Sequence, residues 1–254
     1  MVLTLMTRVP AATRPGRRRA GRPRGPAGDQ VIWVYAITDA LSPDQFDGLT
    51  GVGGEAVRPV TEAGLSAVVG SVDAGAFGEH ALARTLGGLD NIERVGRAHH
   101  QVIACAAAAG GPVLPLRLAT IHPDAGTVRA LLARRHGEFA GMLDRFRNTV
   151  EWGMQIYGPA GPAEAVQRAE DFADAIDSAL SDIAVATRRQ PGEDPRSTGR
   201  AEWLVRSGAY LLPADRAAEF TAVAHTLASG QYGGVRTDVN GPWPPYSFVD
   251  ELEA

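Results

Sequence analysis

The sequence predicts an α+β protein of two domains, with mixed or antiparallel sheets that carry helices on one face. Helical periodicity and β-branched runs alternate as helix–strand–helix–strand within residues 90–157, and again within residues 163–240. A Gly-Pro-Ala-Gly-Pro break at residues 158–162 separates the two halves. A chain of 254 residues suits two domains of ordinary size. The repeated element order indicates that at least one of them is ferredoxin-like.

The predicted boundaries give a disordered basic arm (1–29), an N-terminal α+β domain (30–158) and a C-terminal ferredoxin-like α+β domain with an extended Pro/aromatic tail (159–254). The first 28 residues hold 7 of the 25 arginines and many Pro and Gly, so they cannot form a core. A disordered tail, an over-extended gene start (Met6 is another start) and a nucleic-acid-binding arm are the three explanations. The remaining 18 arginines face 29 acids, and such an acidic body repels nucleic acid, so no nucleic-acid partner is expected.

The first domain is expected to open on a buried strand, because residues 31–38 are β-branched and aromatic. From Asp90 onward, apolar residues recur at steps of three and four, which predicts a helix that ends at Gly110. The other elements expected are a hairpin (57–60 and 65–72), an irregular stretch (73–88), a strand (113–120), a helix opening at residues 123–124 and continuing to Phe146, and a strand (149–157).

The second domain is expected to begin with an amphipathic helix over residues 163–185. Its acids lie off the apolar stripe, which favours a solvated face over a patch that docks a basic partner; they are Glu164, Glu170, Asp171, Asp174, Asp177 and Asp182. The elements that follow are a polar loop (190–200), a strand (202–212), a short helix (215–227), a strand (235–240) and an extended closing segment (241–246).

Motifs for catalysis or cofactor binding are absent from the sequence. It has no Gly-rich phosphate loop, no lysine for a Walker motif and no nucleophile elbow. The lone Cys105 excludes a disulfide framework and a cysteine-based zinc site, and its Ala-rich surroundings favour a small buried residue. His99 and His100 point about 100° apart on a helix, so they cannot chelate one metal ion. We therefore expect no metal, no cofactor and no enzyme activity.

Membrane insertion is not expected either. The longest uncharged run, residues 98–116, contains two histidines and a glutamine that would need partners in lipid. Gly110–Gly111–Pro112 also breaks this run into the end of a helix and a strand. We expect a soluble protein.

Two residues leave a second function open. His99 continues the apolar stripe of its helix, which favours a hydrogen-bonded core histidine over a metal ligand. Arg117 lies mid-strand between apolar neighbours, which favours a structural ion pair over an anion or substrate site. If both lined an open pocket, the chain would be a ferredoxin-like small-molecule-binding protein or enzyme that uses Arg117 and His99.

Three segments together carry a resemblance to a known family. They are VLPLR at residues 113–117 after the His-bearing helix, VEWGM at residues 150–154, and GPWPPYSFV at residues 241–249. In this order and spacing, residues 31–249 resemble the gas vesicle protein F/L family, accessory proteins of bacterial and archaeal gas vesicles. The motif residues that we expect to be structural or to dock a partner are Pro115, Arg117, Trp152, Gly153, Gly241, Pro242, Trp243, Pro244, Pro245 and Tyr246.

The resemblance implies a two-domain α+β protein with a ferredoxin-like element and no catalytic activity. It implies a gas vesicle or cytoplasmic location and partnership with the small hydrophobic shell protein and other accessory proteins. The chain would be a minor component or assembly factor that binds the shell protein and limits its aggregation during nucleation. Since unpolymerised subunits expose apolar surface, such a carrier could offer an apolar groove ringed by charge, or lend an edge strand.

The sequence departs from the family in two places. Leu118–Ala119–Thr120 stands where the family usually has Phe-Gly-Thr, which implies that a close backbone approach is relaxed here. The basic arm has no counterpart in the family, which favours an over-extended start. In the tail, Trp243 and Tyr246 are held by prolines, and they form either a latch against the body or a strip that docks a partner.

Overall fold

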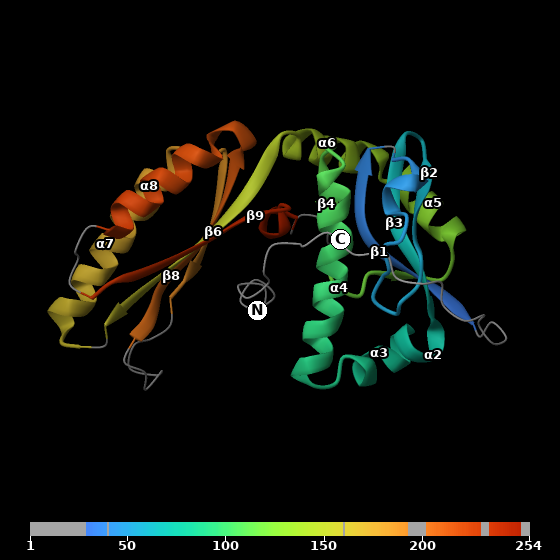
Figure 1. The fold of residues 1–254 in the computed structure, drawn as a ribbon, viewed down its shortest axis with the longest axis horizontal. Helices are drawn as coiled ribbons and strands as arrows, with labels where there is room; N and C mark the ends of the chain where they lie inside the picture. The colour runs from blue at the N-terminus through green and yellow to red at the C-terminus, as the bar shows by residue number, and fades with distance from the viewer. Residues whose placement is uncertain (1–28, 40, 160, 193–201, 230–233, 250–254) are drawn as a thin grey trace. The chain divides into compact units, whose positions relative to one another are not determined.

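The computed structural model describes residues 29–39, 41–159, 161–192, 202–229 and 234–249. All but the last residue of the predicted basic arm therefore lies outside the described residues. The chain divides into two compact units, Met1–Arg147 and Asn148–Ala254, and each is built around one antiparallel sheet (Figure 1).

The first unit is a five-stranded sheet with helices packed against it. Its elements are β1 (Gln30–Asp39), η1 (Pro43–Phe46), β2 (Val57–Glu62), β3 (Leu65–Asp73), α2 (Ala74–Phe77), α3 (Glu79–Thr85), α4 (Leu89–Ala108), β4 (Val113–Pro115), β5 (Ile121–His122), α5 (Ala125–Arg134) and α6 (His136–Phe146). The strand order is β2-β3-β1-β4, and β5 also pairs with β1. The strand predicted at residues 31–38 is confirmed as the central β1, which is buried from Ile32 to Thr38.

Local sequence explains the hairpin and the long helix of this unit. Ala63 and Gly64 connect β2 to β3 with φ angles of 51° and 85°, which are the positive values that a tight hairpin turn requires. The apolar stripe of α4 is buried as its spacing predicts, with Val95, Val102 and Ile103 fully inaccessible to solvent.

Two sequence predictions in this unit are wrong in detail. Residues 73–88 are not irregular, because they contain the short helices α2 and α3. The single helix expected to reach Phe146 is two helices, since Arg135 leaves helical geometry at φ −105° and ψ 21°. The predicted start is confirmed: Asp124 caps α5 by accepting a hydrogen bond from the backbone N–H of Thr127 at 2.7 Å.

The second unit follows the order β-α-β-β-α-β. Its elements are β6 (Thr149–Pro159), α7 (Ala163–Ser181), β7 (Ala186–Pro191), β8 (Glu202–Pro213), η2 (Ala214–Arg216), α8 (Ala217–Ser229), β9 (Arg236–Trp243) and η3 (Tyr246–Phe248). The strand order β7-β8-β6-β9, with both helices on one face (Figure 1), is the ferredoxin-like arrangement that the sequence predicted. Its core between helices and sheet includes Phe172, Trp203, Tyr210 and Phe220.

The division between the units differs from the predicted boundary. Residues 149–158 were placed in the first domain, but they belong to β6, which pairs with β8 and β9 of the second unit. In the predicted Gly/Pro break, Gly158 and Pro159 are the last residues of β6, and Gly161 and Pro162 directly precede α7. The sequence prediction also missed β7. This edge strand is polar from Thr187 to Gln190, so it lacks the apolar alternation by which a strand is recognised.

Candidate functional site

The motif residues fall into two groups. Trp152 and Gly153 lie in β6, and Gly241, Pro242 and Trp243 end β9, which pairs with β6. Pro244, Pro245 and Tyr246 continue from that end, so the second unit brings eight of the ten motif residues to one end of a strand pair. Pro115 and Arg117 belong to the first unit.

Glycine is required where β9 meets β6. Gly241 has φ 143°, and a Cβ there would lie 2.8 Å from the ring of Trp152 and 3.0 Å from the Glu151 carbonyl oxygen. A Cβ on Gly153 would lie 2.6 Å from the Asn240 side-chain oxygen, which accepts a hydrogen bond from Trp243 Nε1 at 2.8 Å. The two glycines therefore let the strands and their aromatic side chains approach closely.

The C-terminal segment closes over a buried carboxylate. Glu151 in β6 is fully inaccessible to solvent, and its two carboxylate oxygens accept hydrogen bonds from Ser247 N–H at 2.8 Å and from Ser247 Oγ at 2.7 Å. Burial raises the pKa of Glu151 to about 7, although both hydrogen bonds from Ser247 act in the opposite direction. Burial, with Glu151 nearby, also raises the pKa of Tyr246.

Glu151 and Ser247 were not singled out from the sequence, although both lie inside motif segments. The one signal available was a charged residue in an otherwise apolar and aromatic strand, TVEWGMQIY. Such a carboxylate needs donors, but the sequence does not say that they come from a segment 96 residues later.

The segment around Arg117 differs from its prediction as a continuous strand. The strand expected at residues 113–120 stops at Pro115, passes through a turn at residues 117–120, and resumes as β5 against the same β1. Within the turn, the Arg117 carbonyl oxygen accepts hydrogen bonds from the N–H and Oγ of Thr120. Arg117 is thus exposed on a turn rather than buried mid-strand.

The same turn explains why the family usually has glycine where this chain has Ala119. Its φ is 71°, in the left-handed region that favours glycine. The constraint at position 119 is therefore the backbone conformation of the residue itself. The sequence analysis had instead expected a relaxed close approach between two backbone segments.

His99 is the hydrogen-bonded core histidine that its spacing predicted. Trp33 Nε1 donates to His99 Nδ1 at 3.0 Å, so the other ring nitrogen carries the proton and donates to the Leu116 carbonyl oxygen at 3.0 Å. Burial lowers the pKa of His99 to about 4, which keeps the ring neutral at physiological pH. With both nitrogens engaged and Arg117 exposed on a turn, the two residues do not form the pocket that the enzymatic alternative requires.

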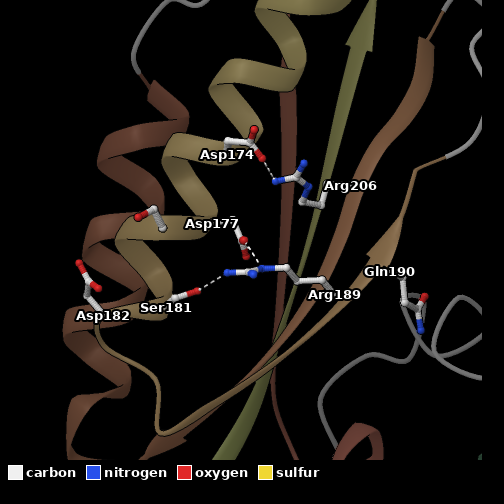
Figure 2. A pocket seen from close by; sticks show the side chains of 8 residues that line it. Asp174, Asp177, Ser181, Asp182, Arg189, Gln190 and Arg206 are labelled. Atoms are coloured by element: carbon white, nitrogen blue, oxygen red, sulfur yellow. Dashed lines mark hydrogen bonds and ion pairs between the residues drawn. The ribbon is translucent and has the colours of Figure 1, made fainter.

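A second group of charges lies between α7 and the strands β7 and β8 (Figure 2). Asp177 is 3% exposed, accepts a hydrogen bond from the Tyr210 hydroxyl at 2.7 Å and forms an ion pair with Arg189. Asp174 forms an ion pair with Arg206. Asp177 was expected on a solvated face. That expectation is wrong, because the residue borders the apolar stripe and its charge is neutralised by Arg189 of β7.

Metal ligands and membrane spans were also sought. In the described ranges, no three His, Cys, Asp or Glu side chains are grouped so that they could hold a metal ion. Among those same residues, every helix is too short or too polar to cross a membrane.

Comparison with known proteins places the chain in a family. A family model described as gas vesicle synthesis protein GvpL/GvpF matches residues 31–165 and 160–250. Gas vesicle protein L of Streptomyces sp. (strain CB03234) is 32% identical over 256 residues, which cover 89% of this chain and 95% of that protein. Gas vesicle protein F of the same strain is 28% identical over 189 residues, which cover 59% of this chain and 76% of that protein.

Solved structures show the same fold. The crystal structure of gas vesicle protein GvpF from Anabaena sp. PCC7120 has a TM-score of 0.69 at 16% identity, and the match covers 87% of this chain and 96% of that one. The Microcystis aeruginosa GvpF structure has a TM-score of 0.66. Since the family model spans both units and the Streptomyces protein L matches along almost its whole length, the chain belongs to the gas vesicle synthesis protein GvpL/GvpF family.

Proposed function

We propose that this chain is a gas vesicle accessory protein that binds the small hydrophobic shell protein and limits its aggregation while the vesicle nucleates. It acts by binding, without catalysis, as a minor component or assembly factor at the gas vesicle, alongside other accessory proteins. The observation that carries this proposal is the family match across both units.

The geometry of the polar groups supports a binding role. His99, Glu151 and Asp177 are buried, and each is engaged by a hydrogen bond or an ion pair from its own unit. Reactive groups must be presented to a substrate, whereas these groups fasten helices, strands and the C-terminal segment to one another.

Co-expression with the shell protein tests the proposal. We expect the tagged chain to retain the shell protein in a pull-down, and to reduce the light scattering of shell protein diluted from denaturant. A ferredoxin-like protein of similar size and charge serves as the control and should do neither. A chain that forms no complex and leaves the scattering unchanged would contradict the proposed function.

A further inference from the structure

Large apolar side chains are sparse on the part of the surface that the structure describes. Among the described residues, the exposed large apolar side chains are Leu89, at 75% exposure, and Val185, at 60%. They belong to different units, so within the described residues neither unit has two of them. Strand pairing at a sheet edge covers part of an unpolymerised subunit without relying on such side chains, because the backbone makes the contacts.

The outer side of β7 is the most accessible sheet edge in the described part of the chain. The edge strand β2 contains Pro59, which has no N–H to donate, and β4 has only three residues and ends in Pro115. The outer strand β9 is half-buried along most of its length. In β7, by contrast, the side chains from Arg188 to Gln190 are exposed, and alternate backbone N–H and C=O groups of an edge strand face outward.

Two neighbouring features fit an incoming extended segment. Val185 is exposed, directly precedes β7 and offers an apolar contact at the start of the edge. A hollow of about 560 Å³ lies between α7 and this strand (Figure 2). Side chains on the helix side of a strand added next to β7 would enter that hollow.

The charge in the hollow indicates which side chain enters it. Asp174 and Asp177 are already paired with Arg206 and Arg189. Asp182 also lines the hollow, is exposed, and has no ion pair within the described residues. Arg189 shows that a basic side chain on a strand can reach α7, since it extends from β7 to Asp177 (Figure 2). One basic side chain from an added strand would neutralise the remaining carboxylate.

We propose that the outer edge of β7 is the docking site for an extended segment of the gas vesicle shell subunit, which adds as a further strand and places a basic side chain beside Asp182. This inference rests on the proposed function, because that function supplies the partner. Backbone pairing would give the affinity, and the hollow below α7 would select the segment.

Hydrogen exchange on the full-length chain, with and without shell subunits, tests the docking site. We expect the amides of β7 to exchange at least ~10-fold more slowly in the complex, because pairing protects outward N–H groups. Amides of β9, the opposite edge of the same sheet, should be unchanged. Protection confined to β9 or to the first unit would overturn the inference and leave the proposed function standing.

A matched pair of charge reversals tests the hollow. Asp182→Arg should weaken shell-subunit binding at least ~10-fold, and the fold should tolerate it because a positive charge suits a helix C-terminus. Asp171→Arg makes the same change at an exposed position of α7 outside the hollow and should bind as the wild type does. Equal affinities of the two variants would overturn the inference.

Two further outcomes separate the possible occupants. Protection of β7 that appears without shell subunits and grows with protein concentration would assign the edge to a second copy of this chain and overturn the inference. A wild-type chain that binds no shell subunit at all would overturn the proposed function, and the inference with it.

Discussion

At the scale of single residues, each unit buries a carboxylate that hydrogen-bond donors hold in place. In the first unit, Glu55 is 3% exposed and accepts hydrogen bonds from the Tyr35 hydroxyl at 2.5 Å and the Gly53 N–H at 2.8 Å. In the second unit, Glu151 is held by Ser247. Neutral donors compensate a buried negative charge only in part, so the ionised form of Glu151 remains costly.

Replacing Glu151 with Gln should make the second unit more stable at alkaline pH. The pKa of Glu151 in the folded protein is about 7, above its ordinary value of 4.5, so the stability present below pH 4.5 is lost as the pH rises through 7. Gln keeps the shape and an acceptor oxygen without a charge. The free energy of unfolding of Glu151→Gln should equal that of the wild type at pH 4 and exceed it by ~3 kcal/mol at pH 8.

The quantity to measure is the difference in free energy of unfolding between Glu151→Gln and the wild type, from urea titrations at each pH. Buried His99, whose pKa is lowered to about 4, acts in the opposite sense, since its contribution is lost as the pH falls from 6.5 to 4. Exposed Asp182→Asn is the control and should leave the pH profile unchanged. Equal stability of Glu151→Gln and the wild type at pH 8 would contradict the assignment.

Ala119→Gly should stabilise the first unit, although glycine usually destabilises. At φ 71° the alanine is strained, and relief of that strain outweighs the larger entropy of the unfolded glycine chain. We expect a gain of ~0.5–1 kcal/mol in thermal unfolding. The control, Ala133→Gly on the exposed face of α5, should lose ~1 kcal/mol instead. A loss at both positions would show that residues 116–120 do not keep this turn in solution.

At the scale of secondary structure elements, the sequence predicted those that bury one continuous face. The buried strands β1 and β3 and the helices α4 and α7 all bury a continuous apolar face. Elements that lack such a face were missed or misjudged. The edge strand β7 is polar. The strands β4 and β5 are short, and the hydrogen bonds of the turn between them leave no hydrophobic pattern in the sequence.

The candidate site was predictable to a similar extent. The resemblance located the segments that meet where β9 joins β6, because their Gly, Pro and Trp residues are distinctive. It did not identify the contact of Glu151 with Ser247. Periodicity shows that a residue faces one side of a strand, but not which distant segment covers that side.

Truncation after Asn240 separates the two explanations of the C-terminal segment. We expect it to destabilise the second unit by at least ~3 kcal/mol in thermal unfolding, because Glu151 loses both donors and β6 loses the end of its partner strand. This is the behaviour of a latch. A truncated chain with wild-type melting that has lost only shell-protein binding would instead indicate a docking strip.

At the scale of the whole molecule, the boundary between the units decides which fragments fold. Residues 148–254 contain the complete β-α-β-β-α-β unit, whereas a fragment that starts at residue 159, the boundary expected from the sequence, lacks the interior strand β6. We expect the first fragment to unfold cooperatively in circular dichroism and the second to remain unfolded. Cooperative unfolding of the shorter fragment would show that β6 is dispensable.

The hydrogen bonds between Glu151 and Ser247 also have a consequence for synthesis. The two residues are 96 positions apart, so Glu151 leaves the ribosome long before its hydrogen-bond donors do. Until Ser247 follows, the carboxylate of Glu151 stays uncovered, and a polypeptide that terminates before Ser247 never covers it. Proteases degrade such open chains preferentially. Closure of the second unit thus favours molecules that were translated beyond Ser247.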